Sequence, residues 1–143
     1  MANGNHHVVW EHRQAELWNR IFQATQDIVA FAEILPENAG TRLVQEELIR
    51  SAMSIGSQLV RANAADDRPS FVQAVNEARL KAIETDYWLR MAYTIQKREE
   101  LQRDISGLLG QYAAIIDLLQ TFTHHVEREP DAVSRHTKGP RVT

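Results

Sequence analysis

Apolar residues recur along this chain at steps of three and four, in four long runs separated by short polar breaks. Such steps keep a stripe on one face of a helix, whereas a strand would alternate by twos. The stripes are Leu17/Ile21/Ala24/Ile28/Phe31/Leu35, Val44/Leu48/Ala52/Ile55/Leu59/Ala62, Phe71/Val75/Ala78/Ala82/Thr85/Leu89/Ala92 and Leu101/Ile105/Leu108/Tyr112/Ile115/Leu119/Phe122/Val126. The pattern predicts four helices, each with one core-facing seam.

The breaks between the stripes fix the predicted helix ends. The first helix should begin near Trp10 and end before Pro36, and Thr41 should cap the second, which runs to about Ala65. The turn Asp66-Asp67-Arg68-Pro69 should cap a third helix that ends near Gln96. The charged corner at residues 97–100 contains no Gly or Pro, so it marks the start of the fourth helix only weakly.

Connections this short favour an all-α, antiparallel, up-down-up-down four-helix bundle. The expected organisation is a flexible leader over residues 1–9, one bundle domain over 10–127 and a disordered tail over 128–143, where the apolar pattern is lost. A chain of 143 residues can bury a core of this kind without covalent help. Small residues in the second helix and Gly107 and Gly110 in the fourth suggest close helix packing or a kink.

The amino-acid composition limits the expected cellular compartment and the kinds of covalent and metal chemistry that the protein can have. The net charge is −3 at pH 7 and there is no cysteine, so we expect neither a disulfide framework nor a thiolate metal site. No apolar run is long enough to cross a bilayer, and the first residues do not resemble a signal peptide. We therefore expect a cytoplasmic protein with no membrane partner.

Catalytic and metal motifs are missing from the sequence. It contains no Glu-x-x-His pair of the di-iron bundles, no phosphate-binding glycine loop and no zinc-protease motif. His124 and His125 are adjacent and diverge by about 100° on a helix, which suits one metal poorly. We predict a protein that is not an enzyme, with no catalytic, cofactor-binding or metal-binding residues and no cofactor.

Two features of the helix surfaces indicate binding instead. Leu80, Tyr87 and Met91 form an outer stripe on the third helix, nearly opposite its core seam, which predicts an oligomer or partner interface. Basic residues also align, as Arg79, Arg90 and Lys97 on the third helix and as Arg50 and Arg61 on the second. These lines are either solvated, salt-bridged faces or, repeated around an oligomer, a surface for nucleic acid or another partner.

Short motifs in the second and third helices resemble a known bacterial family. They are Arg50-Ser51-x-x-Ser54-Ile55-Gly56, Ala62, Arg68-x-x-Phe71 and Glu84-x-x-Tyr87-Trp88-Leu89. This combination is similar to the four-helix bundle proteins encoded in intervening sequences of 23S rRNA genes, and to the accessory variability proteins of diversity-generating retroelements. The resemblance covers roughly residues 14 to 126.

The resemblance implies a ring-shaped homopentamer without a known catalytic site, which in the retroelement branch assists a reverse transcriptase and binds nucleic acid. The chain departs from the family pattern at Gln58, usually Asn, and at Arg61 and Lys81, both usually Glu. Two hypotheses for function follow: a non-catalytic oligomeric interaction scaffold, or an RNA-binding accessory protein.

Overall fold

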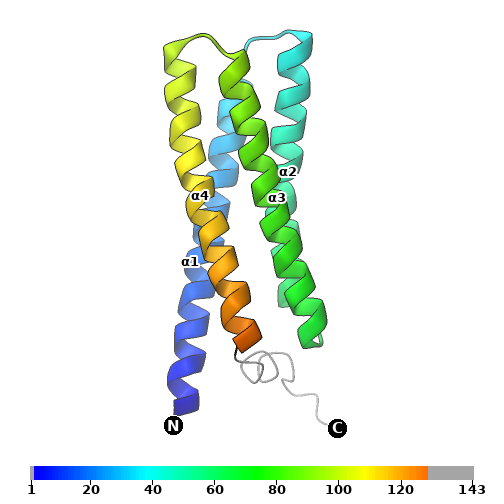
Figure 1. Ribbon diagram of the computed structural model, residues 1–143, viewed down its shortest axis with the longest axis vertical. Coiled ribbons are helices and arrows are strands. Elements are labelled where there is room, and N and C mark those ends of the chain that lie inside the picture. The colour runs from blue at the N-terminus through cyan, green and yellow to red at the C-terminus, as the bar shows by residue number, and fades with distance from the viewer. Residues whose placement is uncertain (1, 129–143) are drawn as a thin grey trace.

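Four helices make up the described part of the chain in a computed structural model, which describes the backbone of residues 2–128 and the side chains of residues 14–124. The helices are α1 (Ala2–Glu33), α2 (Ala39–Asn63), α3 (Arg68–Ile95) and α4 (Glu99–Arg128). Figure 1 shows the α1–α2 and α3–α4 connections at one end of the molecule and the α2–α3 connection at the other. Consecutive helices are therefore antiparallel, and the predicted up-down-up-down four-helix bundle is confirmed.

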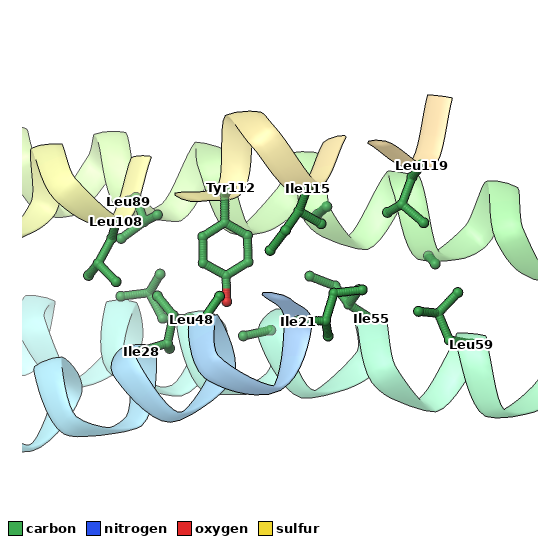
Figure 2. Close-up of a cluster of buried hydrophobic side chains, with 14 of the residues drawn as sticks. Ile21, Ile28, Leu48, Ile55, Leu59, Leu89, Leu108, Tyr112, Ile115 and Leu119 are labelled. Atoms are coloured by element: carbon green, nitrogen blue, oxygen red, sulfur yellow. The ribbon is translucent and has the colours of Figure 1, made fainter. Parts of the chain in front are cut away.

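Each helix packs against two neighbours in the order α1, α2, α3, α4 and back to α1, with the most extensive packing between α2 and α3. All the predicted stripe residues between Leu17 and Phe122 are buried. The apolar ones form one hydrophobic cluster, and Thr85 is the stripe residue that carries a buried hydroxyl group. Val126 lies outside the described side chains. The cluster fills the space between the helices, as Figure 2 shows for its central part.

The start of α1 differs from the prediction. The helix begins at Ala2 rather than near Trp10, so residues 2–9 are helical where a flexible leader was expected. No proline interrupts residues 2–33, and once a helix is nucleated each added residue forms another backbone hydrogen bond without needing an apolar stripe. The predicted tail begins at Arg128, which ends α4, and its remaining residues lie outside the described part of the chain.

The helix caps partly agree with the sequence. Asp67 caps α3 by accepting a hydrogen bond from the Ser70 N–H at 2.8 Å, and Pro69 lies in the first turn, as predicted. For α2 the predicted cap, Thr41, is wrong. The cap is Asn38, whose side chain accepts from the Thr41 N–H at 2.9 Å, while the Thr41 side chain is buried.

Candidate interaction surfaces

The described side chains form no cluster of three or more His, Cys, Asp or Glu residues that could hold a metal ion. His124 is exposed, and His125 lies outside the described side chains. The features described next lie on the outer surface of the bundle.

The outer stripe of α3 is exposed at two of its three positions. Leu80 is 45% exposed and Tyr87 is 53% exposed, whereas Met91 is half-buried and packs against the core. Ile83, one turn before Tyr87, is also exposed and was missed because it lies to one side of the predicted line. We call Leu80, Ile83 and Tyr87 the α3 ridge.

An aromatic contact braces this ridge. The ring of Tyr87 meets the ring of Trp88 edge to face, with centroids 5.0 Å apart. Trp88 is itself half-buried against the hydrophobic core. The indole therefore belongs to the packing between helices, and it helps to hold the more exposed Tyr87 ring in place.

Other helices also carry large apolar side chains at the surface, which the sequence reasoning did not single out. Phe22 on α1 is 62% exposed, and Met53 and Val60 on α2 are 54% and 58% exposed. Each lies away from the core stripe of its helix, so a calculation of helix faces could have found them. Exposed apolar side chains are thus distributed over α1, α2 and α3.

The two basic lines do not merge into one patch. Thr85 and Gln96 bond to residues of α2 and so mark the side of α3 that faces α2. At about 100° per residue, Arg79 and Arg90 fall on another flank of α3, toward α4. Lys97 lies beyond the end of α3, after the extended Gln96, so its predicted alignment with Arg79 and Arg90 on one helix is wrong. Arg50 and Arg61 are exposed on α2. One bundle therefore presents two separate basic lines.

The basic side chains differ in their partners. Arg90 forms an ion pair with Asp86 at 2.8 Å, and this hydrogen-bonded carboxylate raises the pKa of the Arg90 guanidinium. Among the described residues, no carboxylate forms an ion pair with Arg50, Arg61, Arg79 or Lys97. Of these five basic residues, Arg90 alone is salt-bridged among the described residues, and the two predicted alternatives, a solvated face and a binding surface, both stay open for the others.

A groove lies between α1 and α4 at the level of the α4 glycines. It has a volume of about 480 Å³ and is open to solvent. Its lining includes Asp27 and Phe31 from α1, Ile34 from the turn after α1, and Asp104, Gly107 and Leu108 from α4. The walls are held together by a hydrogen bond that the Gln111 side chain donates to Asp27 at 3.1 Å.

The glycines of α4 do not serve packing within the chain. A Cβ atom built on Gly107 or Gly110 would meet no atom within 4 Å, and both residues are exposed. The predicted close packing at these positions is therefore wrong for the isolated bundle. Glycine inside a helix costs about 1 kcal/mol relative to alanine, so α4 carries two unfavourable residues that no internal contact requires.

Comparison with known proteins identifies the family to which this four-helix bundle belongs. Residues 13–120 match the family model of the 23S rRNA-intervening sequence protein, and the chain belongs to that family. The match covers most of α1, α2, α3 and most of α4 and confirms the resemblance seen in the sequence motifs. No curated protein matches the chain.

Among solved structures, the chain is similar to the crystal structure of a protein of unknown function from the S23 ribosomal protein family of Bacteroides thetaiotaomicron. The two share 21% sequence identity with a TM-score of 0.70, over 78% of this chain and 98% of that chain. At this identity the likeness supports the shared four-helix fold. None of the described helices has a segment long and apolar enough to span a membrane.

Proposed function

We propose that this chain is a non-catalytic bundle that assembles with copies of itself and works as an interaction scaffold. The observation that carries the proposal is the outward exposure of large apolar side chains on three helices, chiefly the α3 ridge together with Phe22 and Met53. Soluble monomers rarely expose contiguous apolar surface, and the three side chains of the α3 ridge follow one another along one helix. A symmetric assembly would cover them.

Family membership supports the same proposal. The family resemblance implies a ring of five copies, and the matched residues 13–120 contain nearly all of the bundle. The described side chains also contain no cluster of three or more residues that could hold a metal ion. Cytoplasmic localisation is part of this proposal, as an oligomer without cysteine suits a reducing compartment.

The native mass of the untagged protein tests the scaffold. Size-exclusion chromatography with light scattering should give a multimer near five subunits, and a monomer would overturn the proposal. Replacing Ile83 and Tyr87, both exposed on the α3 ridge, together by Glu should yield smaller species, because charge would be buried at the interface. A matched pair, Gln120→Glu with Thr121→Glu on the exposed part of α4, should leave the mass unchanged.

An RNA-binding accessory role is the alternative, and one observation favours it. Arg50 and Arg61 are exposed on the same side of α2 and have no ion-pair partner among the described residues. Repeated around an oligomer, such guanidinium groups would create a field that attracts phosphate backbones. The same reasoning applies to Arg79 on α3 and to Lys97 in the α3–α4 connection.

The absorbance ratio at 260 and 280 nm, recorded across the same chromatographic peak, separates the two roles. Excess 260 nm absorbance would favour the accessory role, and its absence the protein-partner scaffold. For the accessory role, affinity for a labelled single-stranded RNA should fall steeply with salt and weaken when Arg50 and Arg61 become Glu. Unchanged RNA affinity in that variant would exclude the α2 line as the binding surface.

A further inference from the structure

The α1–α4 groove lacks an occupant within the described chain, and Gly107 keeps it open. Gly107 lines the groove, and a Cβ at this position would have free space around it. Any larger side chain here would project into the groove beside Leu108 and Asp104. No contact within the described chain requires this glycine, and the open space beside it leaves room for a group from outside the chain.

The walls of the groove define what would fit. Ile34 is 57% exposed at its edge, and Phe31 and Leu108 contribute apolar surface deeper within. The carboxylates of Asp27 and Asp104 also line the groove together with the guanidinium group of Arg103, so acidic groups outnumber basic ones in the lining. A partner should therefore offer an apolar ridge with cationic groups along one side of it.

The α3 ridge has this chemistry. Leu80, Ile83 and Tyr87 follow one another at steps of three and four, which is the spacing by which a helix presents anchors to a groove. Arg79 and Arg90 lie along one flank of that ridge, and Arg79 has no ion-pair partner among the described residues. The ridge and the groove are thus complementary both in apolar surface and in charge.

We propose that the α3 ridge of one copy docks into the α1–α4 groove of the next copy, so that Arg79 and Arg90 face Asp27 and Asp104. This pairing rests on the proposed oligomeric scaffold and names its contact. The two surfaces belong to different helices of the bundle, so the contact is heterologous: each copy gives a ridge to one neighbour and a groove to another. Such contacts close into a ring or continue as a filament.

Two complementary variants test the pairing. Gly107→Arg fills the groove, and because α4 has open space and no left-handed backbone at this position, the helix should fold as before. Leu80→Glu with Tyr87→Glu removes the ridge at two exposed positions. Each variant alone should fall to the mass of one subunit in light scattering, with helicity by circular dichroism unchanged.

Mixing the two variants provides the decisive measurement. The groove-blocked chain keeps its ridge and the ridge variant keeps its groove, so an equimolar mixture should form a dimer with one of each chain and grow no further. Gly110→Arg, on the same helix but outside the groove lining, is the matched control and should assemble like the wild type.

The outcomes separate this contact from the scaffold itself. If the wild type is a multimer and Gly107→Arg assembles equally well, the groove contact is overturned and the scaffold stands. If the mixture stays monomeric, the pairing is likewise overturned. If Phe22→Glu breaks assembly while Gly107→Arg does not, the receiving surface lies at α1–α2 instead. A monomeric wild type removes both proposals.

Discussion

The hydroxyl group of Thr85 on α3 donates a hydrogen bond to Ser51 Oγ on α2 across 2.9 Å, with both side chains buried. The Thr85 hydroxyl also lies 2.9 Å from the Lys81 carbonyl oxygen, and Ser51 Oγ donates to the Leu48 carbonyl at 3.3 Å. These bonds keep the two hydroxyl groups satisfied inside an otherwise apolar seam. They also set the register of α2 against α3 at this point of the bundle.

Removing this contact should destabilise the bundle moderately. We expect Thr85→Val, which keeps the side-chain shape, to lower the free energy of unfolding by about 1 kcal/mol, the usual net value of a buried hydrogen bond. Ser51→Ala should behave similarly, and the double variant should lose less than the sum because both partners are then absent. Urea denaturation of the four proteins measures this coupling. Strictly additive losses would mean that the two hydroxyl groups do not interact.

The same seam shows how far the sequence can predict the fold. The apolar stripes identify the buried face of each helix because helical periodicity alone determines which residues share a face. Thr85 fits a stripe by position and is buried as predicted, but Ser51 lies beside its stripe. Its burial depends on the neighbouring α3, which the local pattern of α2 cannot reveal.

The corner between α3 and α4 illustrates a second limit. No glycine or proline ends α3, yet Gln96 adopts an extended conformation with φ −82° and ψ 127°. Its buried side chain donates to Thr41 Oγ1 at 3.2 Å, and its carbonyl accepts from the Gln102 side chain at 2.9 Å. A contact with the distant start of α2 thus helps to fix the corner. Because the corner itself has no glycine or proline, its own residues predict this helix boundary only weakly.

The candidate surfaces were predicted in part. Leu80 and Tyr87 lie opposite the apolar stripe of α3, so the sequence predicts that they lie outside the core. Both are exposed. It did not find the α1–α4 groove, because a groove depends on the distance between two helices far apart in the sequence. Gly107 was noticed, but only the structure shows that its missing side chain faces open space.

Filling the other open glycine position should stabilise the fold. Gly110→Ala adds a methyl group that meets no neighbouring atom within 4 Å and reduces the backbone freedom of the unfolded chain. We expect the free energy of unfolding to rise by about 0.5–1 kcal/mol, as measured by urea denaturation. A loss of stability would show that the α4 backbone at Gly110 cannot accept a side chain.

Tyr112 places a polar atom in the core, and its removal should be tolerated. Figure 2 shows its ring reaching from α4 toward Ile28 and Leu48. Its buried hydroxyl makes no hydrogen bond of good geometry with the described residues, although the Thr25 side chain lies close enough to lower its pKa. Since an unsatisfied buried hydroxyl is unfavourable, we expect Tyr112→Phe to leave the free energy of unfolding unchanged or to raise it by about 1 kcal/mol. A clear loss of stability in urea denaturation would reveal a bond that the hydroxyl makes, for example to an enclosed water.

The same residue should make the bundle sensitive to alkaline pH. Burial raises the pKa of the Tyr112 hydroxyl well above its usual range; the neighbouring Thr25 side chain offsets this slightly, and the nearby Asp27 carboxylate adds to it. The unfolded chain releases this proton near pH 10, while the folded chain retains it to higher pH. Above pH 10 the unfolded state therefore binds fewer protons, and the free energy of unfolding should fall as pH rises.

Equilibrium unfolding between pH 9 and pH 11.5 measures this slope. Tyr112 should contribute a loss approaching about 1.4 kcal/mol per pH unit once its unfolded-state pKa is passed, and Tyr112→Phe should remove that part of the slope. Tyr93→Phe is the matched control, because Tyr93 lies on the surface of α3 and its replacement should leave the slope as in the wild type. If Tyr112→Phe and the wild type lose stability in parallel, the buried hydroxyl ionises in the folded bundle as easily as in the unfolded chain. That result would require solvent to reach the centre of the core between α4 and the α1–α2 pair.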